Sequence, residues 1–235
     1  MLPNFIIIGA QKAGTTSLYE NICKHPKINR CAIDEGHYFN RYNYFENDEP
    51  KPKGLKWYKS LFAAGDGHIT GEKTPAYSAL PLIPARIEKV VPDVRLIMSV
   101  RNPVDRAYSQ YVMERRRNSE LMSFCHAIIA NEYKHMYISR GYYASQIKNF
   151  LRYFDRGQLF IVDFAMLSQH CLYEQIFRFL GLEQVKIDIS VHRKAKKYPD
   201  MNPVVEDFLY EYYREPNEEL FDFLGQDLGW NRRKS

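Results

Sequence analysis

The chain has 235 residues, of which 45% are hydrophobic and 26% are charged, and its formal net charge is +5. This length and apolar content fit one globular α/β domain with a sizeable core, and they argue against a disordered chain. The positive charge is too small to indicate a nucleic-acid-binding protein, but it suits an anionic ligand.

The amino-terminal stretch predicts a buried strand, a glycine-bounded loop and a helix. The strand is the apolar run Phe5–Ile8, and the loop has the glycine spacing of the phosphate-binding template G-x-x-x-x-G-K-[ST]. Thr15 stands where that template has lysine, and the only lysine of the loop is Lys12. Backbone amides and the hydroxyls of Thr15 and Thr16 can still hold phosphate oxygens. The missing Lys-Ser/Thr pair, which organises magnesium, argues against an ordinary ATPase or kinase.

The next informative segment follows a helix expected over 14–23 and an extended stretch over 28–33. It places Glu35 and His37 beside aromatic residues in the sequence Asp-Glu-Gly-His-Tyr-Phe. A carboxylate there can take the proton of a hydroxyl or amine that attacks an electrophile. An isolated loop glutamate is usually just solvent-exposed, but the aromatic neighbours and the position after the loop favour a functional Glu35. His37 either orients Glu35, binds the acceptor or is simply packed.

Two further predicted strands are each followed by a basic residue. His68–Glu72 reads as a buried strand followed at once by Lys73, and the carboxyl edge of an α/β sheet is where ligands bind. The alternative for Lys73 is an exposed loop lysine. A strand over 94–100 ends at Arg101, and Ser109 lies about two turns into a helix that begins near position 103.

The remaining pattern predicts packing elements. We expect Arg106 to be structural and paired with a carboxylate, Arg115–Arg117 to form a solvated face, and Trp57 to pack under the site. Helices are expected over 55–62, 80–91, 122–133, 142–154, 173–180, 203–213 and 217–224, with a fourth buried strand over 159–163.

These motifs, in this order, resemble the sulfotransferases that use 3′-phosphoadenosine 5′-phosphosulfate (PAPS). The chain is most similar to the carbohydrate branch, which includes heparan sulfate N-deacetylase/N-sulfotransferases and heparan sulfate O-sulfotransferases. The resemblance rests on the loop, on boxes of the type E-x-x-x-F, E-K-[ST]-x-x-Y and R-[DN]-P-x-x-R-x-x-S, and on a basic stretch over 192–201. That stretch is similar to a K-G-R-K-Y-P-x-M loop, with Ala195 in place of glycine and Lys196 in place of arginine.

The resemblance implies a role for each matched residue. Glu35 would be the catalytic base, Lys12 would stabilise the leaving oxygen, Lys73 would assist, and His37 would support them. The implied cofactor-binding residues are Lys12, Ala13, Gly14, Thr15 and Thr16 in the loop, Arg101 and Ser109 at the 3′-phosphate, and Lys194, Ala195, Lys196, Lys197 and Tyr198 in a closing segment. The product would be adenosine 3′,5′-bisphosphate (PAP), and no metal is expected.

We therefore expect a single sulfotransferase domain over 1–235 with a P-loop-NTPase-like fold, in which helices flank a central, mainly parallel sheet. The expected reaction moves a sulfuryl group to a hydroxyl or amine of an acceptor, with a glycan favoured. A P-loop kinase or NTPase and a non-catalytic binder of nucleotides or glycans are the alternatives.

The cellular setting is predicted from what the sequence contains. The four cysteines are scattered and form no C-x-x-C pair, which argues against zinc and against a disulfide framework. No apolar stretch approaches the about 20 residues of a membrane span, and no signal peptide is visible. We expect a cytoplasmic protein of bacterial type, with a Golgi-lumenal domain trimmed of its anchor as the alternative. No nucleic-acid partner is expected, and the oligomeric state stays open.

Overall fold

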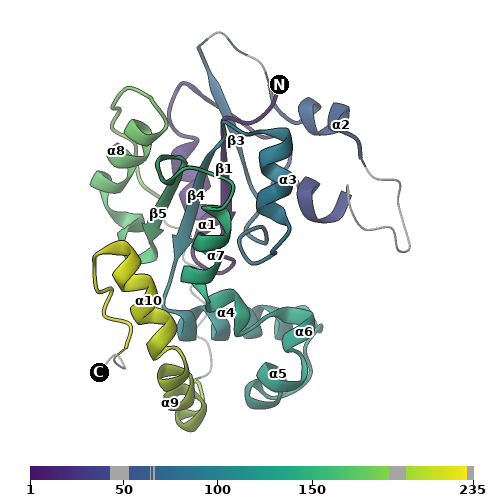
Figure 1. The fold of residues 1–235 in the computed structure, drawn as a ribbon, viewed down its shortest axis with the longest axis vertical. Coiled ribbons are helices and arrows are strands. Elements are labelled where there is room, and N and C mark those ends of the chain that lie inside the picture. The colour runs from purple at the N-terminus through teal and green to yellow at the C-terminus, as the bar shows by residue number, and fades with distance from the viewer. Residues whose placement is uncertain (43–52, 64, 66, 191–199, 232–235) are drawn as a thin grey trace.

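The structure is a computed structural model of the chain, and it describes residues 1–42, 53–63, 65, 67–190 and 200–231 (Figure 1). Within these residues, five parallel strands form one sheet in the order β2-β3-β1-β4-β5. The strands are β1 (Phe5–Gly9), β2 (Ile28–Arg30), β3 (Ile69–Lys73), β4 (Arg95–Val100) and β5 (Leu159–Asp163). The prediction of a parallel sheet with flanking helices is confirmed.

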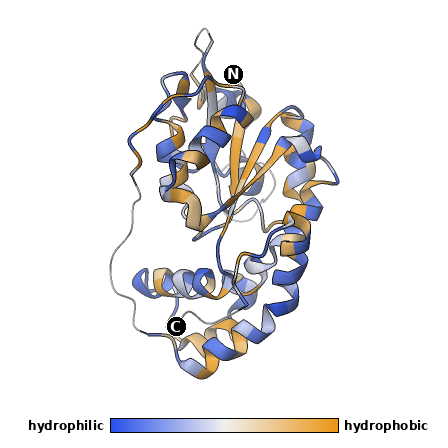
Figure 2. Cartoon of the chain, turned by 90° about the vertical axis from the view of Figure 1, so that its left-hand side faces the viewer, coloured by the Kyte–Doolittle hydropathy of each residue, from blue (hydrophilic) through white to orange (hydrophobic). Residues whose placement is uncertain are grey.

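The central strand β1 is buried along its whole length. Phe5, Ile6, Ile7 and Ile8 are fully buried, because a strand covered on both faces has no solvent side with which to alternate. Figure 2 shows the strands as a nearly continuous apolar block inside more polar helices. Ile7 pairs with Lys73 on β3, so the carboxyl ends of β1 and β3 lie side by side.

Helices cover both faces of the sheet (Figure 1). Helices α1 (Thr15–Ile22) and α8 (His170–Phe179) pack on the face that presents Phe5 and Ile7. Helices α3 (Ile83–Val90), α7 (Tyr143–Phe150) and α10 (Arg214–Leu224) pack on the opposite face. The two apolar clusters lie above and below the sheet, which gives the three layers expected from the sequence.

A third apolar cluster lies beyond the carboxyl ends of the strands, around helix α4 (Figure 1). It joins α4 (Pro103–Arg116), α5 (Phe124–Ala130) and α9 (Pro203–Tyr212), and the short α6 (Glu132–His135) follows α5. The tip of the sheet is therefore bordered by a helical layer with its own core.

Several boundaries differ from the prediction. The 28–33 stretch forms only a three-residue edge strand, and the helix expected over 122–133 is divided into α5 and α6 at Asn131. Helix α10 begins at Arg214, earlier than expected, because Pro216 is tolerated in its first turn. The helix over 55–62 is α2 (Leu55–Ser60). Among the described residues, no helix combines the length and apolarity needed to cross a bilayer.

Candidate active site

The loop between β1 and α1 is held by contacts with distant segments. The amide of Ala10 donates to the carbonyl of Ser99 at 2.7 Å, and the Ser99 hydroxyl donates to the carbonyl of Ala13, also at 2.7 Å. Gly14 has a φ of 75°, and a Cβ there would lie 2.4 Å from Cδ1 of Leu167. Only glycine fits this position without strain, so the second glycine of the predicted template has a steric reason.

The start of α1 adjoins this loop and presents backbone amides that have no acceptor within the helix. Gly14 is the N-cap and makes no side-chain cap, so the first amides of the helix have no intrahelical acceptor. The helix dipole adds partial positive charge at the same place. Thr15 is buried and Thr16 is exposed. The Ala13 amide already donates to the carbonyl of Ala10 at 3.1 Å. The start of α1 therefore has the donor chemistry that an anion site needs, and binding of an anion there stays a prediction.

Arg101 brings a guanidinium to the loop from the tip of β4. Its Nη1 donates to the carbonyl of Lys12 at 3.2 Å, and its guanidinium lies 4.8 Å from the ring centroid of Phe164. Its Nε is buried and has no hydrogen-bond partner among the described residues. Its ion pair with Asp105 is long, at 3.9 Å. This guanidinium retains donor capacity that an anionic ligand can use.

Lys12 and Ser109 lie on the same side of the sheet as Arg101. Lys12 has a φ of 71°, and its Nζ lies 3.7 Å from Sδ of Met113 on α4. Ser109 is buried on α4, eight residues after Arg101. The loop lysine, the strand-tip arginine and the helix serine all border the carboxyl edge of the sheet.

A carboxylate cluster lies beside the loop, at the end of β3. Lys73 Nζ is 3.2 Å from Oε1 of Glu35 and 3.0 Å from Oδ1 of Asp34. The His37 ring lies between Glu35 and Asn40, with its Nε2 3.1 Å from Oε2 of Glu35. The three residues predicted to act together, Glu35, His37 and Lys73, are thus in direct contact.

The cluster keeps Glu35 ionised. Burial opposes ionisation of the Glu35 carboxyl, but the hydrogen bond to His37 and the charge of Lys73 outweigh it, so its pKa lies below the ordinary value. The Lys73 side chain is only 1% exposed, whereas that of Asp34 is 75% exposed. The exposed-lysine alternative for Lys73 is therefore wrong. Lys73 is the last residue of the buried strand β3, and burial of its ammonium is tolerated because two carboxylates pair with it.

Glu72 packs behind this cluster, and its supporting role was not predicted, although it is the first residue of the E-K-[ST]-x-x-Y box. It is fully buried, with Oε1 accepting a hydrogen bond from the Tyr58 hydroxyl at 2.5 Å and Oε2 accepting one from Thr74 at 2.9 Å. The amide of Gly36 also donates to this carboxyl. Burial raises its pKa, although these hydrogen bonds act in the opposite direction. Glu72 therefore anchors the backbone of the segment that carries Glu35.

Arg106 is structural, as expected, but its predicted carboxylate partner is wrong. The side chain is fully buried, and one terminal nitrogen donates to Oε1 of Gln110 at 2.8 Å. The other donates to the carbonyl of Tyr137. Arg106 thus connects α4 to the segment before α7 through neutral acceptors. Its long side chain supplies a hydrogen-bond donor to the backbone carbonyl of Tyr137.

Two other sequence predictions agree with the structure. Trp57 is partly buried and lies 6.4 Å, centroid to centroid, from Tyr38 in the core beneath the Glu35 segment. Arg115, Arg116 and Arg117 are exposed at the end of α4, which fits a solvated face.

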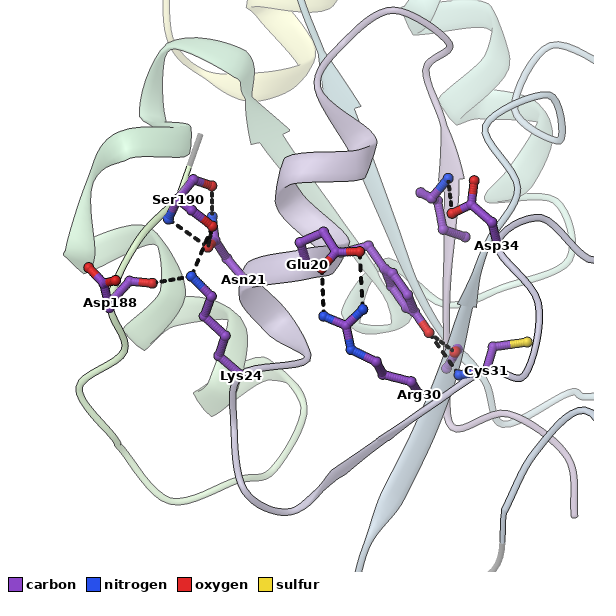
Figure 3. Close-up of polar contacts among 11 residues, drawn as sticks. Glu20, Asn21, Lys24, Arg30, Cys31, Asp34, Asp188 and Ser190 are labelled. Atoms are coloured by element: carbon purple, nitrogen blue, oxygen red, sulfur yellow. Dashed lines mark hydrogen bonds and ion pairs between the residues drawn. The ribbon is translucent and has the colours of Figure 1, made fainter. Parts of the chain in front are cut away.

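The predicted closing segment Lys194–Tyr198 lies outside the described residues. The chain that leads to it is anchored on α1 (Figure 3). Buried Asn21 accepts a hydrogen bond from the amide of Ser190 at 2.9 Å and donates to the Ser190 carbonyl at 2.9 Å. Lys24 contacts the carbonyl of Asp188 and lies 2.9 Å from the Ser190 hydroxyl. The helix that follows the loop thus also fixes residue 190.

Comparison with known proteins identifies the family. A model of the sulfotransferase domain matches residues 2–215. Mouse heparan sulfate glucosamine 3-O-sulfotransferase 6 is 30% identical, over 97% of this chain and 74% of that protein. Human bifunctional heparan sulfate N-deacetylase/N-sulfotransferase 3 is also 30% identical, over 99% of this chain but only 31% of that protein.

A solved structure shows the same architecture over the whole chain. The crystal structure of a sulfotransferase from Alicyclobacillus acidocaldarius has a TM-score of 0.83 and 26% identity, and the match covers 99% of this chain and 100% of that one. The family model and the relatives show the family, and this solved structure agrees with the α/β architecture. The chain therefore belongs to the sulfotransferase family and is a PAPS-dependent sulfotransferase.

Proposed function

We propose that the enzyme transfers a sulfuryl group from PAPS to a hydroxyl or amine of a glycan, with Glu35 as the base that deprotonates the acceptor. The observation that carries this proposal is the position of Glu35 beside the anion-binding loop, where Lys73 and His37 contact its two carboxylate oxygens. A base must be held in one orientation next to the reacting group, and these two contacts supply that orientation.

The described residues fit an anionic donor. The buried Nε of Arg101 lacks a partner, and the first amides of α1 have no intrahelical acceptor. The amides that follow Ala13 at the start of α1, with Lys12, would hold the 5′-phosphosulfate, and Arg101 with Ser109 would hold the 3′-phosphate. When bound, the donor supplies an activated sulfuryl group and leaves as PAP.

Glu35 is suited to accept a proton at neutral pH because it is in the ionised form. The contacts that hold its pKa below the ordinary value also make it a weaker base. A weaker base is sufficient when the proton leaves the acceptor as the new bond forms, because the acidity of the acceptor rises during the attack. His37 and Lys73 leave little rotational freedom to the carboxylate, so the oxygen that takes the proton is kept in place.

The cations of the site would stabilise charge that develops on oxygen. Lys73 is fixed by its ion pairs, and Lys12 approaches from the loop. Preorganised charges of this kind contribute about 2.7–4 kcal/mol each to lowering a barrier. Such a site needs only small rearrangements during the transfer, because the groups are already oriented by the fold.

The glycan acceptor is proposed from the relatives. Those named above are heparan sulfate sulfotransferases, one acting at oxygen and one at nitrogen. Both have similar identity to this chain, so the choice between hydroxyl and amine is left to the assay. The cytoplasmic location stays a prediction. It was based in part on the absence of a disulfide framework, and all four cysteines are free in the structure.

The test compares Glu35→Gln with Asp34→Asn. Both carboxylates pair with Lys73, but Asp34 is far more exposed, so it serves as a matched control. Mass-detected transfer from PAPS is measured over pools of hydroxyl-bearing and amine-bearing glycans, and PAP binding is measured by calorimetry. We expect Glu35→Gln to bind PAP normally and to lose about 10²–10⁴-fold in turnover. The control should retain most activity. Near wild-type turnover of Glu35→Gln would remove Glu35 as the base.

A further inference from the structure

Arg140 lies next to the anion-binding loop, although it comes from a distant part of the chain. It belongs to the short 3-10 helix η2 (Ser139–Gly141), which lies between α6 and α7. A Cβ on Gly141 would lie 2.9 Å from Cβ of Pro103, so glycine allows η2 to approach the start of α4 closely. Gln146 donates to the Arg140 carbonyl at 3.1 Å, which fixes the backbone there.

The guanidinium of Arg140 contacts the loop through a neutral group. One terminal nitrogen donates to the side-chain oxygen of Gln11, the residue before Lys12. The Nε atom is buried and has no hydrogen-bond partner within the part of the chain that the structure describes. Over the same residues, Arg140 forms no ion pair with a carboxylate. Within those residues, the side-chain amide of Gln11 is thus a neutral partner of a guanidinium that has no ion pair.

The charges around Arg140 act on it in opposite directions. Burial and the positive charge of Arg106 lower the pKa of Arg140 to about 10, while Glu35 is among the carboxylates that act in the opposite direction. Arg140 therefore remains positively charged at neutral pH. A largely buried charge that no carboxylate of the described residues contacts directly is unfavourable.

We propose that Arg140 binds the sulfuryl oxygens of the donor, beside Gln11 and Lys12 of the loop. This inference rests on the proposed function. An anion at this position would supply the acceptor that the buried Nε lacks, and it would pair directly with a charge that no carboxylate of the described residues contacts. A guanidinium presents a planar fork that matches two oxygens of a tetrahedral anion, as lysine cannot.

A purely structural role is the competing explanation. In that case Arg140 would only hold Gln11, and its loss would disturb the loop and weaken every ligand of the loop alike. The two roles separate because PAPS and PAP share the adenosine and both phosphate positions and differ by the sulfuryl group. The ratio of their affinities isolates the sulfuryl contact.

The experiment measures calorimetric affinities for PAP and PAPS without acceptor, in the wild type, Arg140→Gln and the exposed-surface control Arg152→Gln. We expect Arg140→Gln to bind PAP within about two-fold of the wild type and to lose about ten-fold in its preference for PAPS, as one charge-assisted hydrogen bond implies. The control should change neither affinity. Equal weakening of both ligands, or no change in the ratio, would overturn the proposal.

A second variant keeps the test decisive if Arg140→Gln does not fold. Arg140→Lys retains the charge but not the fork, and we expect it to lower the PAPS-over-PAP preference by about three-fold. An unchanged ratio in this variant would also overturn the proposal. If the wild type binds neither PAP nor PAPS, the proposed function itself fails, which is a different result from a loss confined to Arg140.

Discussion

Replacing Lys73 with methionine removes the buried cation of the candidate site and nearly preserves the side-chain volume. Lys73 contacts Glu35 at 3.2 Å and Asp34 at 3.0 Å. Because its charge helps to hold the pKa of Glu35 below the ordinary value, its removal raises that pKa. The acid limb of the pH–rate profile should therefore move to higher pH in Lys73→Met.

The magnitude follows from the distance and the exposure of the pair. Two unit charges 3.2 Å apart attract by about 5 kcal/mol at an effective dielectric constant of about 20. The Glu35 side chain is 35% exposed, so solvent screens this attraction, and fully exposed pairs contribute only about 0.2–1 kcal/mol. We take about 2 kcal/mol for this half-buried pair, within the range of hydrogen bonds to charged groups. Loss of one preorganised cation should also lower kcat about 10²–10³-fold.

The same pair gives a pH dependence of stability. A carboxyl with a lowered folded-state pKa stabilises the fold above its unfolded pKa, and this contribution is lost as the pH falls through the folded pKa. Lys73→Met should lose less of its stability than the wild type over that acid range, because its Glu35 pKa is nearer the ordinary value.

The assay combines pH–rate profiles, PAP calorimetry and urea denaturation. The exposed lysine Lys56 on α2 provides the matched control Lys56→Met, which should behave as the wild type. PAP affinity should stay within a few-fold, since Lys73 contacts the carboxylate cluster rather than the loop. An acid limb that does not move, with kcat within a few-fold of the wild type, would refute the coupling between Lys73 and Glu35.

Two further substitutions test the surroundings of the site. Gly14→Ala should lower stability by about 1–2 kcal/mol and weaken PAP binding, because φ is 75° and the new Cβ meets Leu167. Gly157→Ala, which meets nothing within 4 Å, is its control, and equal thermal and calorimetric effects of the two would contradict this reasoning. Tyr58→Phe should cost about 1–3 kcal/mol in urea denaturation, because it removes a donor from the buried Glu72 carboxyl. The hydrogen bond from Tyr58 lowers the pKa of Glu72, which burial has raised. The stability lost in Tyr58→Phe should therefore grow as the pH rises above the ordinary carboxyl range. A loss of stability that does not depend on pH would count against this reasoning.

The parts of the site that the sequence predicted are those with local signals. The apolar run of β1, the spacing of its loop glycines and the strand-to-helix order around Arg101 are all properties of short segments. Because parallel strands end at one edge of a sheet, these segments also predicted that Lys12, Lys73 and Arg101 would gather there.

The parts that the sequence did not predict depend on contacts between distant segments. Arg106 reaches the carbonyl of Tyr137, Glu72 accepts from Tyr58, and Arg140 contacts the loop across 129 positions of sequence. A buried arginine that uses neutral acceptors has the same local pattern as one paired with a carboxylate. Only the packed arrangement of α4, η2 and the loop distinguishes the two. Sequence alone therefore led to the wrong partner for Arg106.

The sequence of the phosphate-binding loop does not by itself determine the conformation of the loop. Its conformation is imposed by Ser78, Ser99 and Leu167, three residues that lie 69 to 153 positions farther along the chain than the glycines and alanine they contact. Moving residues 9–16 alone into another strand–turn–helix unit would transfer the sequence of the loop without the contacts that set its conformation. A design that reuses this loop would also have to include the carboxyl ends of β3, β4 and β5 and the residues that follow them.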